Sequence, residues 1–318
     1  MGAAPIVVYC HIEKAGGTTI SNLLRRHFGL RHVDVGRRQL RETDAARREA
    51  VRRGFGAPPY HYGPDDLRVD LRLYPGMRSL AGHLLHPFVD FGPDSERLRW
   101  FTVLRHPIAR FRSQYLHEVE GSKRRHLEIP VWLERFVRDD MMVRKLAGAS
   151  DLEAARRIVD ERLRFVGLQE RFDQTLVLLR HRLGLDGLRL AYPAPLNTAD
   201  KRIEDPERRR LREWALDQLA RHERLVEECN RKDLELYRYV ETTVWPRQVA
   251  DFGGELALAE AVARDVRQEP DTLAERLRIA ESLLYRNLVY KPYLRALRAW
   301  RSRAGASHAP GECGPAGR

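Results

Sequence analysis

The apolar residues near the start of this chain fall into short continuous runs. Residues 6–10 (Ile-Val-Val-Tyr-Cys) form one such run and residues 100–104 form another, which is typical of strands buried on both faces of a parallel sheet. Shorter runs at residues 79–83 and 165–168 predict two further strands. Because these strands alternate with helical segments, the pattern predicts an α/β fold whose parallel sheet is covered by helices on both faces.

Helical periodicity accounts for most of the remaining chain. Ile20, Leu23, Leu24 and Phe28 share one helix face directly after the first strand, and Pro107 suits the first turn of another helix. Further helices are predicted over residues 131–146, 152–163, 172–183, 206–239 and 255–299, with a break at Gly253-Gly254. Residues 31–78, rich in Arg, Gly and Pro, predict helix fragments joined by irregular loops.

These patterns divide the chain into three parts. We expect an α/β domain over residues 1–245, a helical C-terminal extension over residues 246–300 and a disordered tail over residues 301–318. With 318 residues and 43% hydrophobic content, the chain can bury one substantial core, so two full domains are not expected.

Charge narrows the range of ligands. The net charge is +12, and 51 arginines outnumber six lysines, which favours acidic ligands such as nucleotides or anionic sugars through bidentate contacts. No zinc-finger spacing or RNA-recognition signature is found, so nucleic acid is not the expected partner. Cys10, Cys229 and Cys313 are too few and too far apart to suggest a disulfide framework or a metal site.

Targeting signals are not apparent in the sequence. The first residues lack the charged start and apolar core of a signal peptide, and no apolar run reaches the roughly 20 residues of a membrane helix. The sequence therefore predicts a soluble cytoplasmic protein without a transmembrane segment.

The loop after the first strand carries the main candidate chemistry. It reads His-Ile-Glu-Lys-Ala-Gly-Gly-Thr-Thr over residues 11–19 and leads into the first helix. Glycines allow close approach of the backbone, and a helix N-terminus favours negative charge, so the loop predicts an anion cradle with Lys14 as a mobile cation. The loop is not a Walker A motif, because Lys14 precedes the glycines instead of following them.

A second strand, turn and helix follows at residues 100–115. Arg105 stands at the strand end and Ser113 some two turns into the next helix, so the two can converge on one phosphate. Lys-x-Gly-Gly-Thr-Thr resembles the donor loop of sulfotransferases that use 3′-phosphoadenosine 5′-phosphosulfate (PAPS), and Arg-x-Pro-x-x-Arg-x-x-Ser-x-Tyr at residues 105–115 resembles their 3′-phosphate motif. The resemblance is to the carbohydrate branch, similar to heparan sulfate 2-O- and family 2 sulfotransferases.

The resemblance extends over residues 6–244. Residues 165–172 resemble the Phe-Val-Gly-Leu-x-Glu-x-Phe segment of the family, and residues 230–237 resemble its Asn-x-x-Asp-x-x-Leu-Tyr ending, both mainly structural. Three residues depart from the family pattern. Glu13 stands where Pro is usual, Ala15 replaces a common Thr and His106 replaces the usual Asp. Because Glu13 is a carboxylate, it has to point away from a polyanionic donor.

The resemblance implies a P-loop-like fold and a role for each site residue. Lys14 would act on the oxygen that bridges phosphate and sulfate, and Arg105 with Ser113 would hold the 3′-phosphate. His83 would be the catalytic base, and no metal is required. The other donor-binding residues would be Ala15, Gly16, Gly17, Thr18 and Thr19. The implied partner is a hydroxyl-bearing acceptor, with a carbohydrate as the expected class.

Two other functional hypotheses stay open. A P-loop-type nucleotide kinase would also bind a nucleotide at the Lys14 loop and would require ATP with magnesium. A non-catalytic binder of acidic polysaccharide would use the arginine-rich surface and would not need His83.

Overall fold

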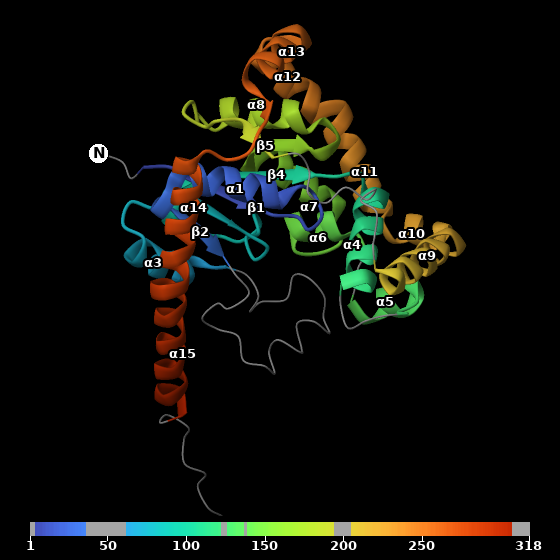
Figure 1. Cartoon of the computed structure of the whole chain (residues 1–318), viewed down its shortest axis with the longest axis horizontal. Coiled ribbons are helices and arrows are strands. Elements are labelled where there is room, and N and C mark those ends of the chain that lie inside the picture. The colour runs from blue at the N-terminus through green and yellow to red at the C-terminus, as the bar shows by residue number, and fades with distance from the viewer. Residues whose placement is uncertain (1–3, 36–61, 122–125, 137–138, 194–204, 307–318) are drawn as a thin grey trace, which may run out of the picture.

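A parallel sheet forms the centre of the molecule (Figure 1). The computed structural model describes residues 4–35, 62–121, 126–136, 139–193 and 205–306. Five strands pair in the order β2-β3-β1-β4-β5, all of them parallel. They are β1 Ile6–Cys10, β2 His32–Val35, β3 Ser79–Gly82, β4 Leu98–Leu104 and β5 Leu163–Leu168. The predicted α/β fold, with helices flanking a parallel sheet, is confirmed.

Helices make up most of the rest. Those before residue 200 are α1 Gly17–Phe28, α3 Pro64–Leu73, α4 Pro107–Gly121, α5 Ile129–Phe136, α6 Met141–Ala147, α7 Leu152–Arg157 and α8 Phe172–Arg182. Those after it are α9 Pro206–Arg221, α10 Glu223–Cys229, α11 Arg231–Tyr239, α12 Trp245–Phe252, α13 Gly254–Asp265, α14 Leu273–Tyr285 and α15 Lys291–Ala306. Short 3₁₀ or π turns are η1 Gly29–Arg31, η2 Gly92–Arg97, η3 Ile158–Arg162, η4 Gln169–Arg171, η5 Val240–Val244 and η6 Arg286–Tyr290, and β6 Ala191–Tyr192 pairs with β7 Arg267–Gln268.

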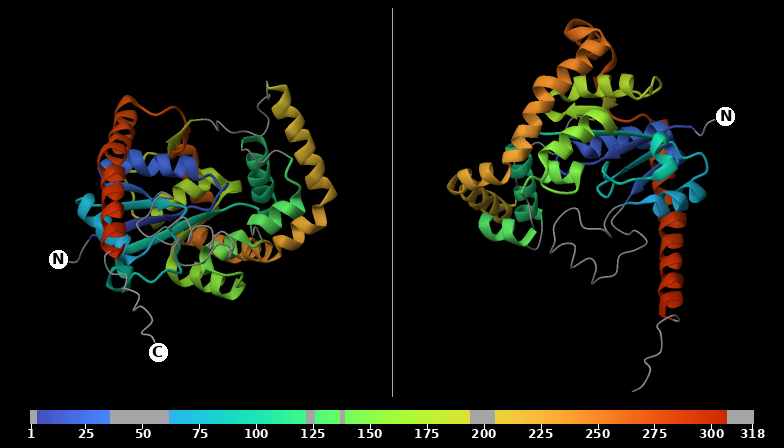
Figure 2. Two further views of the ribbon diagram at one scale, coloured as in Figure 1. Left: turned by 90° about the horizontal axis from the view of Figure 1, so that it is seen from below. Right: turned by 180° about the vertical axis from the view of Figure 1, so that it is seen from behind.

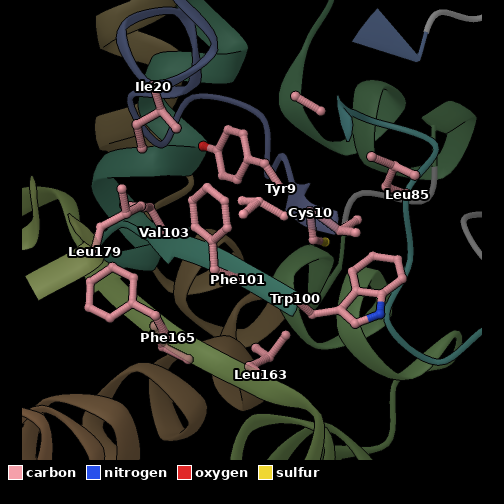
Figure 3. Packing of buried hydrophobic residues seen from close by; sticks show 14 of the residues in the cluster. Tyr9, Cys10, Ile20, Leu85, Trp100, Phe101, Val103, Leu163, Phe165 and Leu179 are labelled. Atoms are coloured by element: carbon pink, nitrogen blue, oxygen red, sulfur yellow. The ribbon is translucent and has the colours of Figure 1, made fainter. Parts of the chain in front are cut away.

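The apolar strands form the main hydrophobic core. All five residues of β1 are buried, and Figure 3 shows Tyr9 of β1 close to Phe101 of β4. Their rings stack with centroids 4.8 Å apart. A second hydrophobic cluster, with Phe111 and Trp132 at its centre, joins α4 and α5 to α9 and α10 (Figures 1 and 2).

The sequence did not predict β2. Its four residues include His32 and Asp34, which break an apolar run, yet His32 is buried and its Nδ1 lies 3.0 Å from Ser79 Oγ on β3. Asp34 accepts two hydrogen bonds from Arg25 of α1 at 2.8 and 2.7 Å. Side chains of the neighbouring elements α1 and β3 therefore satisfy the polar groups of this edge strand.

The helix expected over residues 131–146 is divided into α5 and α6. The segment 206–239, expected as one or two long helices, contains the three helices α9, α10 and α11. Of the helix fragments expected over residues 31–78, α3 is present, whereas residues 36–61 lie outside the described residues.

Helices beyond residue 245 share the main core. Val249 of α12, Leu258 of α13 and Tyr290 of η6 belong to the same cluster as the sheet. The side-chain amide of Gln248 accepts from Val166 N at 3.0 Å and donates to Val166 O at 2.9 Å, and so covers the outer edge of β5.

The last helix extends away from the sheet, as Figures 1 and 2 both show. It ends at Ala306, six residues into the stretch expected as a tail, and residues 307–318 lie outside the described part of the chain. Within that described part, no helix is both long and apolar enough to cross a bilayer.

A buried carboxyl group joins α3 to the C-terminal helices. Asp70 of α3 is 1% exposed, Tyr62 Oη donates to its Oδ2 at 2.8 Å, and the hydroxyl of Tyr290 is a second hydrogen-bond partner. Burial raises the pKa of Asp70 to about 7, against an opposing effect of the two tyrosine hydrogen bonds.

This shift predicts a pH-dependent stability. Since the ordinary pKa of Asp is about 3.9, the native state binds more protons than the unfolded state between pH 4 and 7, and the Asp70 contribution falls as pH rises. At about 1.36 kcal/mol per unit of pKa, the free energy of unfolding falls by on the order of 4 kcal/mol over this pH range. Urea unfolding should therefore show that the free energy of unfolding of Asp70→Asn, compared with that of the wild type, rises from pH 4 to pH 7.5.

Asp65→Asn is the matched control, because Asp65 is only partly buried on the same helix. A difference between wild type and Asp70→Asn that does not vary with pH would contradict the prediction.

Candidate functional site

The candidate residues follow three adjacent strands at the same edge of the sheet. His11 and Lys14 follow β1, His83 follows β3, and Arg105 follows β4. The chain first builds β2 and β3 on one side of β1 and then β4 and β5 on the other side. In open α/β sheets, ligands bind outside the carboxyl ends of the strands at such a switch point. The topology therefore makes this edge the candidate binding site.

The Lys14 loop has an unusual backbone. Lys14 has φ 67° and Gly16, the N-cap of α1, has φ 78°. A lysine in this left-handed region costs about 1–2 kcal/mol, which the surrounding structure has to compensate. Gly16 provides no side-chain cap, and the first turn of α1 has no acidic residue, so its N-terminus keeps its preference for an anion.

The other loop residues differ in accessibility. Ala15 is fully buried, Thr18 is exposed and Thr19 is half-buried. Of the two threonines, Thr18 is thus the more exposed to solvent.

Gly17 packs directly against the ring of His11. A Cβ atom at residue 17 would lie 1.7 Å from His11 Nε2, far inside van der Waals contact. The His11 ring in turn stacks on His83, with centroids 4.0 Å apart. Gly17, the second glycine of the loop, is thus needed for the His11 ring to stack on His83.

Gly17→Ala should therefore displace the His11 ring and destabilise the protein. Overpacking of this kind costs typically 1–3 kcal/mol, which chemical denaturation can measure. Gly187→Ala is the matched control, because its Cβ would only touch His27 at an ordinary 3.5 Å. Equal stability of the two variants would contradict this interpretation.

Arg105 and Lys14 lie together. Arg105 Nη1 donates to the Lys14 carbonyl oxygen at 3.1 Å, which ties the turn after β4 to the loop after β1. Burial and the charge of Arg105 lower the pKa of Lys14 against an opposing effect of Glu120, and burial lowers the pKa of Arg105 against an opposing effect of Glu170. Because the net shift disfavours the charged form of both groups, this edge favours a negatively charged ligand.

Ser113 is half-buried on α4, and its convergence with Arg105 on one phosphate stays a prediction.

His83 lies at the end of a row of stacked rings. Phe101 stacks on Tyr9, Tyr9 on His11 at 5.3 Å, and His11 on His83. His83 Nδ1 is 3.1 Å from the His11 carbonyl oxygen and 3.3 Å from Glu13 Oε1, while 39% of its side chain remains exposed. The stack thus connects a solvent-accessible imidazole to the core.

Glu13 and Lys145 form a charged pair behind His83. Lys145 of α6 is fully buried, and its Nζ lies 3.7 Å from Glu13 Oε1 and donates to the His83 carbonyl oxygen. Burial alone would raise the pKa of Glu13, but Lys145 and His83 outweigh it and bring the value to about 2. Burial, followed by His83, lowers the pKa of His11 to about 3. Glu13 is therefore ionised and His11 neutral near pH 7.

Two segments interpreted from the sequence as mainly structural support the site. Glu170 Oε1 accepts from His106 N at 2.8 Å, and Tyr237 Oη donates to Glu170 Oε2 at 3.0 Å, which fixes the turn that carries Arg105. Asp233 of α11 accepts from Met142 N and Val143 N at 3.0 and 2.8 Å.

This second contact caps the helix that carries Lys145. Glu170, Asp233 and Lys145 were not predicted as site residues. For Glu170 and Asp233, the available signal was their polar positions inside the two motifs.

The structure thus brings the predicted Lys14 loop and Arg105 together, and it places the predicted His83 beside His11 and Glu13, which were not predicted as site residues. Glu13 is paired with Lys145 and His83. No protein-family model matches the chain, and no curated protein is similar enough to count as a match.

Proposed function

We propose that this protein is a sulfotransferase that moves a sulfuryl group from PAPS to a hydroxyl acceptor. The observation that carries the proposal is the proximity of two half-buried cationic residues, Lys14 and Arg105, at the carboxyl ends of adjacent parallel strands, where Arg105 Nη1 donates to the Lys14 carbonyl oxygen at 3.1 Å. PAPS carries phosphate or sulfate on both the 3′ and 5′ sides of its ribose, and two separate cations suit two separate anions.

The donor would lie in a P-loop-like cradle. Gly16, Gly17, Thr18 and Thr19 provide backbone N–H groups and hydroxyls at the start of α1 for the 5′ group. Arg105 and Ser113 provide a forked cation and a hydroxyl for the 3′-phosphate. Lys14 would stabilise the negative charge that develops on the bridging oxygen as the nucleotide leaves.

The transfer is an in-line displacement at sulfur. The acceptor oxygen forms the new O–S bond while the bond from sulfur to the bridging oxygen breaks, and that electron pair stays on the 5′-phosphate. The acceptor hydroxyl gives its proton to His83, since an imidazole is the side chain most often used as a general base. As in phosphoryl transfer, positioning and charge stabilisation supply most of the catalysis.

A carbohydrate hydroxyl is the proposed acceptor class. The arginine-rich composition favours an acidic sugar polymer, which already carries carboxylate or sulfate groups.

Transfer of labelled sulfate tests the function. The purified chain would be incubated with ³⁵S-labelled PAPS and a panel of acceptors that includes acidic polysaccharides, neutral oligosaccharides and simple alcohols. The proposal predicts label on a hydroxyl acceptor without added metal. Phosphate transfer from ATP with magnesium, in place of sulfate transfer, would overturn it.

A further inference from the structure

Two hydrogen-bond acceptors lie close to the Nδ1 atom of His83. The carbonyl oxygen of His11 lies 3.1 Å away and Glu13 Oε1 lies 3.3 Å away. A carbonyl has no proton to donate, and neither does the ionised Glu13 carboxylate. Nδ1 must therefore carry the hydrogen, which leaves Nε2 as the nitrogen that can take up a proton in the neutral ring.

The Glu13 carboxylate is itself held in place. Lys145 lies 3.7 Å from Glu13 Oε1 and also donates to the backbone of His83, so one buried cation contacts both partners. The helix of Lys145 is anchored by Asp233, which accepts hydrogen bonds from its first turn. A buried charge pair with fixed geometry gives orientation more than stability.

His11 is a further ionisable group that packs against His83. Its ring is neutral near pH 7, since burial and His83 lower its pKa to about 3. Among the described residues, Glu13 Oε1 lies 3.3 Å from His83 Nδ1, and Lys145 Nζ contacts the backbone carbonyl of His83.

We propose that Glu13 is a positioning residue that holds His83 in the Nδ1–H tautomer, with Lys145 keeping the carboxylate ionised and in place. The inference rests on the proposed function in one respect, that His83 is the base. As Nε2 takes the acceptor proton, the nearby carboxylate also stabilises the imidazolium that forms. Glu13 therefore assists the base instead of opposing the donor.

Nitrogen NMR of the full-length chain tests the tautomer directly. The ¹⁵N shifts of His83, assigned with His83→Ala, should show a protonated Nδ1 and an unprotonated Nε2 in the neutral wild-type ring. Glu13→Gln keeps the side-chain size but adds an amide that can donate, so the Nε2–H tautomer should appear. Glu153→Gln, on the exposed part of α7, is the matched control and should leave the shifts unchanged.

Kinetics give the second readout. A general base contributes about 10²- to 10⁴-fold, so partial loss of its correct tautomer should lower kcat roughly 10- to 100-fold in Glu13→Gln with little change in KM for the donor. The pH midpoint of the rate should fall, because the imidazolium loses its neighbouring carboxylate.

Should Glu13→Gln fail to fold because the buried Lys145 ammonium loses the Glu13 charge, the double variant Glu13→Gln/Lys145→Met removes both charges and should show the same change in tautomer.

The outcomes separate the two proposals. An unchanged tautomer and pH profile in the Glu13 variants of an active enzyme would overturn the positioning role and leave the proposed function intact. A changed tautomer in a chain that transfers no sulfate would uphold the positioning role and overturn the proposed function.

Discussion

Replacing Lys14 with alanine should lower the rate of sulfuryl transfer by about 10²- to 10³-fold or more, which is the effect of removing one donor that stabilises charge in the transition state. The ammonium is half-buried beside Arg105, where an interaction with developing charge is stronger than in water. Single-turnover kinetics with saturating donor would measure the loss in the chemical step.

Lys291→Ala is the control for this experiment. Lys291 lies on α15, remote from the strand ends, and hydrogen-bonds Asn287. It should leave the rate unchanged. Retention of full activity by Lys14→Ala would contradict the assignment of the loop as the donor site.

Replacing His83 with alanine should abolish turnover but preserve donor binding. The imidazole is the proposed base, worth about 10²- to 10⁴-fold, and it follows β3, on the opposite side of β1 from the Arg105 turn after β4. Transfer assays and calorimetric titration with 3′-phosphoadenosine 5′-phosphate would be run on the same preparation.

His181→Ala, an exposed histidine on α8, is the matched control. Loss of nucleotide binding in His83→Ala would make His83 a structural residue, supporting the His11 ring instead of the chemistry.

The sheet was predictable where strands are apolar on both faces. The runs in β1, β4 and β5 place those strands in the core, and the glycine-rich loop follows β1 directly. By contrast, β2 contains His32 and Asp34, and its polar groups are satisfied by Ser79 and Arg25. A local pattern cannot predict such pairing, since the partners are brought together only by the tertiary fold.

The site was predictable in a similar way. Lys14, His83 and Arg105 each follow a strand, and parallel strands bring their carboxyl ends to one edge. Lys145 was not predicted, because a lysine in an amphipathic helix usually lies in solvent. Its full burial depends on Glu13 and on the position of α6, neither of which periodicity reveals.

The central claim is that the Lys14 and Arg105 site binds a 3′-phosphorylated nucleotide. The most direct measurement is a thermal-shift titration with 3′-phosphoadenosine 5′-phosphate, beside ADP and ATP with magnesium, on the wild type, Arg105→Ala and the control Arg112→Ala. A ligand at about 100 times its Kd stabilises the fold by roughly 2.7 kcal/mol, which such a titration detects.

We predict a shift with the 3′-phosphorylated nucleotide that is lost in Arg105→Ala and kept in Arg112→Ala. A shift with ATP and magnesium alone, or with none of the three nucleotides, would contradict the account.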